Sequence, residues 1–222
     1  MGCSNDSDTD ENEIPVPSGM YFPPVGSNDW ETISIEDLGW KKEAELPLYD
    51  FLEENNSKAM IILKNGRIVL EKYFDDFNAA KNHSWNSAAK TLTSMTVGIA
   101  QEEGLLSIDT ASSNYLGPGW SSLTPEQEGL ITVKNHLTMT TGLDFTVENN
   151  FCTDQECLIF KDDPNTFWYY HNATYSLLDD IIEGASDEDF KAYFNRKIRD
   201  RIGMQGTWIK TGYLNLYFST AR

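Results

Sequence analysis

The chain has few histidines, few cysteines and few basic side chains for its 222 residues. It contains 3 His, 3 Cys and 17 Lys and Arg against 35 Asp and Glu, which gives a formal net charge of −18 at pH 7. An acidic surface repels a phosphate backbone, so we expect no nucleic-acid partner. The histidines and cysteines lack the spacing of metal ligands, and we expect neither a metal nor another cofactor.

Three common enzyme signatures are also missing. The sequence has no G-x-S-x-G nucleophile elbow, no phosphate-binding G-x-x-x-x-G-K-[ST] and no H-E-x-x-H zinc motif. No apolar run is long enough to span a membrane. The hydrophobic fraction of 40% is nevertheless sufficient for the core of one domain or a little more.

A serine and a lysine three residues apart dominate what remains. Ser87 and Lys90 stand at the start of a predicted helix, so both side chains leave the same face about one turn apart. A serine hydroxyl becomes a good nucleophile when a neighbouring base takes its proton, and a lysine is such a base where its own protonation is suppressed. The pair by itself is a common chance match, and the alternative is a serine near a helix start with a surface lysine.

The residues after Lys90 favour the catalytic interpretation. Leu92, Met95 and Ile99 keep a helical spacing, and Gly104 is a typical residue at the end of a helix. The other faces of this helix carry small or apolar residues, which indicates a central helix. A surface lysine is not expected at the beginning of such a helix.

These residues resemble a known family. The stretch Ser87-Ala88-Ala89-Lys90-Thr91-Leu92, the stretch 131–143 and the later Tyr170-His171-Asn172 resemble serine hydrolases of the β-lactamase and penicillin-binding-protein superfamily, in particular its class C-like esterase and amidase branch. The resemblance covers roughly residues 20–222. It implies an α+β, β-lactamase-like fold with a helical region beside an antiparallel sheet.

The resemblance also implies roles for the site residues. Ser87 is the nucleophile, and Lys90 with Tyr170 takes its proton and returns it to the leaving group. Asn172 contacts the lysine and the substrate, and Trp168 is expected to line the substrate site. The neighbouring Tyr169 does not fit the motif, because only Tyr170 has an asparagine two residues later.

The family's third motif, Lys/His-x-Gly, is expected further downstream than this chain reaches. Lys210-Thr211-Gly212 spells that motif, but it follows Asn172 too closely, and we interpret it as a chance match. We therefore expect the chain to stop before the third motif, with C-terminal strands of the fold missing. The resemblance implies that the missing part supplies a backbone N–H, which completes the oxyanion hole together with the N–H of Ser87. Loss of one such donor costs about 10² to 10³ in rate.

The N-terminal residues are expected to form a separate segment. Residues 1–19 are predicted to be a disordered acidic tail, and residues 20–222 an incomplete hydrolase domain. Cys3 with the polar residues after it resembles the mature start of a bacterial lipoprotein, which would place the protein in the periplasm or at the cell surface, attached to a membrane through a lipidated Cys3. The alternative is a cytosolic chain with an unmodified cysteine.

Local patterns predict several further features. A proline-rich segment at 14–30 is expected to wrap onto the domain, anchored by Tyr21, Phe22 and Trp30, and a helix is expected at about 47–55 with Leu48, Phe51 and Leu52 inward. Residues 59–74 predict a hairpin around Asn-Gly. Cys152 and Cys157 are expected to form a disulfide in an exported protein and to remain thiols in a cytosolic one. His136 is expected to have a packing or hydrogen-bonding role.

We therefore expect a monomeric serine hydrolase that acts on a small ester, an amide or a D-amino-acid peptide through an acyl-enzyme at Ser87. Two alternatives stay open. One is a non-hydrolytic surface lipoprotein that uses the same pocket to bind peptidoglycan-like ligands, and the other is a truncated product without independent function.

Overall fold

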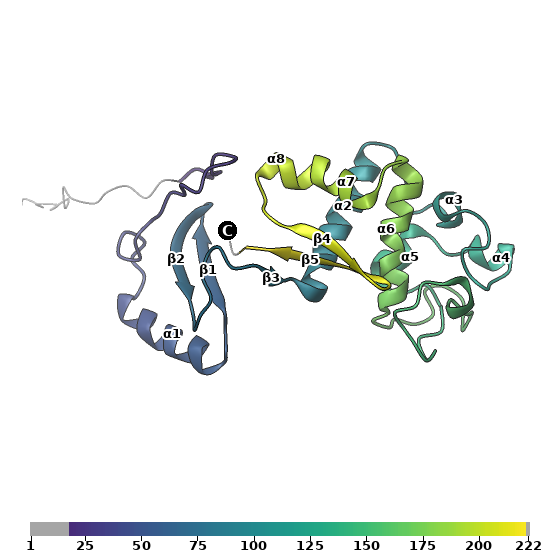
Figure 1. Cartoon of the computed structure of the whole chain (residues 1–222), viewed down its shortest axis with the longest axis horizontal. Helices are drawn as coiled ribbons and strands as arrows, with labels where there is room; N and C mark the ends of the chain where they lie inside the picture. Colours follow the sequence, from purple (N-terminus) through teal and green to yellow (C-terminus); the bar gives the residue numbers. More distant parts are fainter. Residues whose placement is uncertain (1–17, 221–222) are drawn as a thin grey trace, which may run out of the picture. The chain divides into compact units, whose positions relative to one another are not determined.

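The computed structural model describes residues 18–220. The chain divides into two compact units, which meet in the sequence between Lys81 and Asn82. Cys3 and nearly all of the predicted acidic tail lie outside the described residues, so the tail, its boundary at residue 20 and the lipidation stay predictions. Helices occur beside antiparallel sheets, which is the predicted α+β class (Figure 1).

The first unit is built on the predicted hairpin. Strands β1 (Ala59–Lys64) and β2 (Arg67–Tyr73) pair antiparallel, with Lys64 opposite Arg67. Asn65 and Gly66 between them both have positive φ, 49° and 81°, as a tight two-residue hairpin turn requires. The Asn-Gly pair was therefore a sufficient signal for this element.

The segment before the hairpin packs onto it. The Trp30 indole donates a hydrogen bond of 2.7 Å to the Gly66 carbonyl, and a bridge between Thr32 and Ile68 extends the pairing alongside β2. A Cβ on Gly66 would collide with the Tyr21 backbone, so glycine also permits this close approach. Tyr21 and Trp30 are anchors as predicted, whereas Phe22 is 79% exposed and is not one.

The first helix was predicted at about the right position, but the burial of its apolar side chains was predicted only in part. The short 3₁₀ turn η1 (Lys42–Ala44) leads into α1 (Glu45–Glu54), which contains no buried residue. Leu48 and Leu52 are half-buried, but Phe51 is 60% exposed, which contradicts its predicted inward position. The helical spacing predicted the helix correctly but not which of its apolar side chains are covered.

The second unit combines a small sheet with a helical layer. Strands β3 (His83–Ser84), β4 (Thr207–Thr211) and β5 (Leu214–Ser219) form an antiparallel sheet in the order β3-β5-β4. The first of these strands comes directly before Ser87, and the other two come more than a hundred residues later in the sequence. The sheet therefore connects the start of this unit to its last residues.

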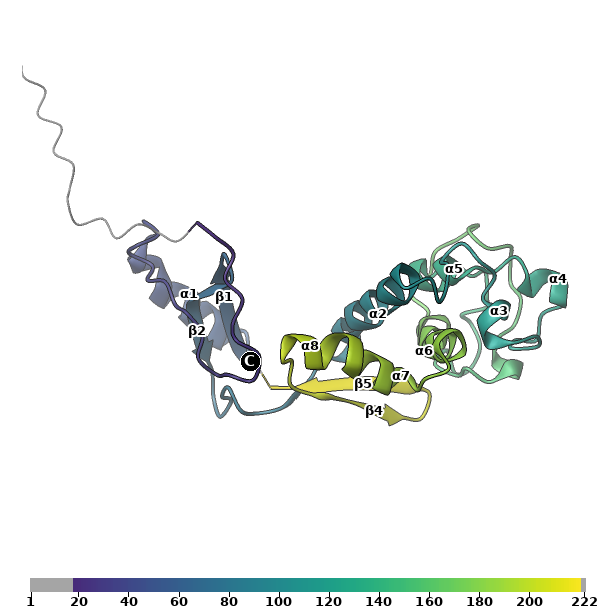
Figure 2. The same ribbon diagram turned by 90° about the horizontal axis from the view of Figure 1, so that it is seen from above.

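Helix α6 (Asn172–Ser186) is the centre of this unit. It packs against α2 (Lys90–Glu102), α3 (Ser113–Leu116), α5 (Val133–Thr138) and α7 (Phe190–Phe194), as two perpendicular views show (Figures 1 and 2). Its residues Leu178, Ile181 and Ile182 have no exposed surface. Full burial of a leucine or isoleucine side chain contributes about 1.5 to 3 kcal/mol, so α6 is held firmly in place.

The remaining elements are short. They are η2 (Asn86–Ala89), α4 (Pro125–Glu128), η3 (Gln155–Cys157), the π-helical turn η4 (Asn195–Arg199) and α8 (Asp200–Ile202). Helix α7, the turn η4 and helix α8 follow one another directly in the sequence. None of the helices in residues 18–220 has the length and apolar character needed to cross a membrane.

Candidate active site

Ser87 lies in a turn that the sheet holds in place. The Trp85 amide donates to the Tyr217 carbonyl at 2.9 Å, and the Trp85 indole donates to the Ser219 hydroxyl at 2.7 Å. The next residue, Asn86, has a φ of 46°, in the left-handed region that asparagine tolerates better than most residues. The chain then enters η2, whose first turn contains the exposed Ser87 and leads into α2.

Lys90 occupies the centre of the predicted residues. Its amine donates a hydrogen bond of 2.9 Å to Asn172 Oδ1, the first residue of α6. The same amine lies 5.1 Å from the centre of the Tyr170 ring and 5.5 Å from that of Tyr175. Ser87, Lys90, Tyr170 and Asn172 are thus brought together from two segments that are distant in the sequence.

The environment of Tyr170 differs from that of an ordinary tyrosine. Burial would raise the pKa of its hydroxyl, but hydrogen bonding to Ser87 and Lys90 and the positive charge of Lys90 lower it, and the net shift is downward from 10.0. A lowered pKa makes the phenolate form more accessible at neutral pH. Tyr170 is therefore suited to exchange protons with Ser87 and Lys90.

Tyr175 is a contributor that the sequence did not reveal. Its hydroxyl donates a hydrogen bond of 2.9 Å to the backbone carbonyl of Lys90, and its ring contributes to the apolar and aromatic surroundings of the Lys90 amine. The signal was available, because Tyr175 follows Asn172 by three residues and so shares its face of the helix.

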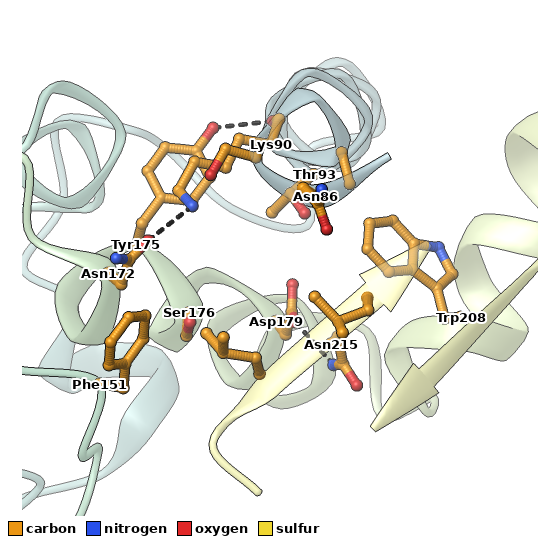
Figure 3. A pocket seen from close by; sticks show the side chains of 14 residues that line it. Asn86, Lys90, Thr93, Phe151, Asn172, Tyr175, Ser176, Asp179, Trp208 and Asn215 are labelled. Atoms are coloured by element: carbon orange, nitrogen blue, oxygen red, sulfur yellow. Dashed lines mark hydrogen bonds between the residues drawn. The ribbon is translucent and has the colours of Figure 1, made fainter. Parts of the chain in front are cut away.

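A cavity of about 240 Å³ opens beside Ser87 and Lys90. Three segments line it: the beginning of α2, one face of α6 and the hairpin of β4 and β5, with Phe151 at one side (Figure 3). The face of α6 contributes Asn172, Tyr175, Ser176 and Asp179, which follow the i, i+3, i+4, i+7 pattern of one helical face. The cavity thus connects the proposed nucleophile to residues two helical turns away.

Asp179 is the acidic group of this cavity. It is 8% exposed, and its Oδ2 accepts a hydrogen bond of 2.7 Å from the Asn215 side chain. Burial raises the pKa of its carboxyl to about 7, although the Asn215 hydrogen bond and the charge of Lys210 act in the opposite direction. A carboxylate in this position is costly unless a positively charged group approaches it.

The remaining predicted residues lie elsewhere. Trp168 is 65% exposed and does not line the cavity, so its role in substrate binding stays a prediction. Lys210 and Thr211 end strand β4 and Gly212 lies in the following turn, and none of the three lines the cavity with Ser87. Cys152 and Cys157 form a disulfide with a Cα–Cα distance of 5.8 Å.

His136 has the structural role that we expected. It is fully buried, with Nδ1 2.8 Å from the Thr174 carbonyl oxygen and Nε2 3.1 Å from the Ser112 hydroxyl. Burial lowers the pKa of its imidazole to about 4, so the ring is neutral at pH 7. His171 is also buried, and burial lowers its pKa as well.

No group of three or more potential metal ligands occurs within residues 18–220.

Comparison with known proteins assigns the chain to a family. Residues 53–213 match the family model described as Beta-lactamase. The protein named "Putative penicillin-binding protein PbpX" from Bacillus subtilis (strain 168) is 29% identical over 163 residues, which cover 67% of this chain and 40% of that protein. The chain therefore spans less than half the length of this relative.

Solved structures share the fold. The "Putative 6-aminohexanoate-dimer hydrolase from Bacillus anthracis" superposes with a TM-score of 0.62 at 19% identity, over 79% of this chain and 54% of that one. A penicillin-binding protein from Bacillus halodurans superposes with a TM-score of 0.62 at 17% identity, over 78% of this chain and 70% of that one. The family match covers most of the chain and the fold agrees with it, so the chain belongs to the β-lactamase family.

Proposed function

We propose that the protein is a hydrolase that cleaves an ester or amide through a covalent acyl-enzyme on Ser87. The observation that carries this proposal is the position of the Lys90 amine, 2.9 Å from Asn172 Oδ1 and 5.1 Å from the Tyr170 ring centre, one helical turn after Ser87. An oriented amine and a phenol with a lowered pKa next to a serine can take its proton, which activates the hydroxyl as a nucleophile.

The reaction proceeds in two balanced steps. Ser87 Oγ attacks the substrate carbonyl carbon, and its proton passes to the pair formed by Lys90 and Tyr170. The bond from the carbonyl carbon to the leaving group then breaks, and the alcohol or amine leaves with that proton. A water molecule then attacks the acyl-enzyme, releases the carboxylic acid and restores the Ser87 hydroxyl. Proton transfer by positioned groups contributes typically about 10² to 10⁴ in rate.

The intact mass of the chain after incubation with a fluorophosphonate tests the proposal. We expect one adduct per chain, lost in Ser87→Ala and retained in Ser113→Ala, a serine at the start of α3 that does not line the cavity. A folded wild-type chain without an adduct contradicts the proposal, as does an adduct that persists in Ser87→Ala. Circular dichroism of the same samples shows whether each chain is folded.

A further inference from the structure

The cavity beside Ser87 is lined by a buried carboxylate that forms no salt bridge with another described residue. Asp179 Oδ2 accepts the Asn215 hydrogen bond, while Oδ1 has no hydrogen-bond partner among the described residues. Figure 3 shows the Asp179 carboxylate directed into the space between α2, α6 and β5. The side chain is more than nine-tenths buried and forms no salt bridge within residues 18–220.

The charged groups around Asp179 do not neutralise it. Asp180 and Glu183 on α6 raise the pKa of its carboxyl further, and only Lys210 on β4 opposes them. Lys90 faces the same cavity, but its amine is bound to Asn172, seven residues earlier on α6. Seven residues of helix rise about 10 Å, so Lys90 is not a direct partner of Asp179.

We propose that Asp179 is the anchor for a primary ammonium group of the substrate. The substrate class is then a linear amide or ester with an ammonium group some distance from the bond that is cleaved. The inference rests on the proposed function, because it places that bond at Ser87. Asn172, which holds the Lys90 amine beside Ser87, and Asp179 are separated by a rise of about 10 Å along α6, so the ammonium group and the cleaved bond are expected to be several atoms apart.

Three features of the cavity fit such a ligand. The Asp179 carboxylate supplies the charge, and the aromatic and aliphatic side chains of Phe151, Leu214 and Leu216 line the cavity as a surface for a methylene chain. A bound ammonium also offsets the cost of the buried negative charge, which is largest above pH 7. Binding of the ligand is therefore coupled to proton release from Asp179 and strengthens as the pH rises.

Isothermal titration calorimetry of the whole chain with n-hexylammonium tests the inference without any need for catalysis. We expect saturable binding of one ligand per chain at pH 8, at least about tenfold weaker at pH 5.5, where Asp179 is protonated and the ligand keeps its charge. We expect 1-hexanol, which has the same chain and a neutral end, to bind at least about tenfold more weakly than n-hexylammonium at pH 8 and to bind equally at the two pH values. Equal binding of the two ligands at pH 8 would overturn the inference.

Two variants distinguish Asp179 from the general acidity of the protein. Asp179→Asn preserves an oxygen for the Asn215 hydrogen bond and is expected to weaken n-hexylammonium binding at least tenfold. Asp180→Asn removes the same charge from the next residue, which is exposed and does not line the cavity with Ser87, and is expected to bind as the wild type does. Unchanged binding in Asp179→Asn, or equal loss in both variants, contradicts the assignment.

Fluorophosphonate labelling separates failure of this inference from failure of the proposed function. Occupancy of the cavity by n-hexylammonium is expected to slow labelling of Ser87 in the wild type and not in Asp179→Asn. Absence of labelling together with Asp179-dependent binding of n-hexylammonium rejects the hydrolase and retains the ammonium site. If Ser87 is labelled, but n-hexylammonium neither slows the labelling nor binds in an Asp179-dependent way, the ammonium site is rejected and the hydrolase is retained.

Discussion

The Lys90 amine and the Asn172 side-chain oxygen lie 2.9 Å apart although 82 residues separate them in the sequence. The contact joins the first residue of α2 to the first residue of α6, so it depends on the packing of two helices. It also fixes the amine within reach of Tyr170. The geometry of the proposed proton transfer therefore depends on the core that packs α6 against α2.

Asn172→Ala is expected to slow fluorophosphonate labelling of Ser87 by about 10- to 100-fold, because it releases the Lys90 amine from its position. Stopped-time labelling followed by intact-mass measurement gives the rate. The matched control is Asn114→Ala, an exposed asparagine on α3 whose rate is expected to equal that of the wild type. Equal rates in both variants would show that Asn172 does not position Lys90.

Asp179→Asn is expected to stabilise the chain at neutral and alkaline pH. Because the pKa of Asp179 is raised from 3.8 to about 7 in the folded state, its favourable contribution is present below the unfolded value and is lost as the pH rises through about 7. The gain in unfolding free energy is expected to grow from near zero at pH 4 to about 1 to 3 kcal/mol at pH 8.

Urea denaturation at several pH values measures this gain, with Asp163→Asn, at an exposed aspartate outside α6, as the control for a change of charge. A wild-type chain that is more stable than Asp179→Asn at pH 8 would refute the prediction. A stabilising substitution that removes ligand binding is the expected behaviour of a residue retained for function.

His136 is expected to make the chain sensitive to acid. Its pKa of about 4 in the folded state lies below its usual 6.5, so its contribution to stability is complete above pH 6.5 and is lost as the pH falls toward 4. The loss is on the order of 3 kcal/mol. NMR titration of the imidazole carbon shift should give the low pKa directly.

His136→Gln provides the second measurement, since it removes the titrating group. The difference in unfolding free energy between the wild type and this variant is expected to shrink between pH 6.5 and 4. A difference that stays constant over this range would contradict the assignment. The buried His171 remains in both proteins, so the comparison isolates His136.

Reduction of the disulfide is expected to loosen one side of the cavity. Cys152 and Cys157 close a short loop that follows Phe151 and contains Asp154, whose Oδ2 accepts a hydrogen bond of 2.5 Å from the Tyr213 hydroxyl. A loop of this length predicts about 2 kcal/mol of stabilisation from the bond. Urea denaturation with and without dithiothreitol measures it, and the double variant Cys152→Ser, Cys157→Ser should not respond to the reductant.

Local patterns predicted the elements of the fold that depend on local chemistry. The Asn65-Gly66 turn needs positive φ at both residues, and the helix after Lys90 needs its apolar spacing, so both are encoded within a few residues. The resemblance of Tyr170-His171-Asn172 to a family motif then predicted which residues meet at Lys90, and the structure brings them together.

The sequence did not predict what depends on distant pairing. The contact of Asp179 with Asn215 exists only because the hairpin of β4 and β5 lies against α6, and no local pattern indicates that neighbour. The same applies to Trp208, which is 4% exposed in the core of the second unit and also lines the cavity. Exposure of Phe51 was missed for a related reason, because helical spacing does not say which apolar face is covered.

The bonds of Trp85 to Tyr217 and Ser219 determine when the site can assemble in the cell. Ser219 follows Trp85 by 134 residues, so a ribosome that adds about 5 to 20 residues per second needs about 7 to 27 seconds to supply the second partner. Until residues 217–219 leave the exit tunnel, the turn that presents Ser87 lacks its support. The geometry that presents Ser87 is therefore expected to be complete only after β5 has been synthesised.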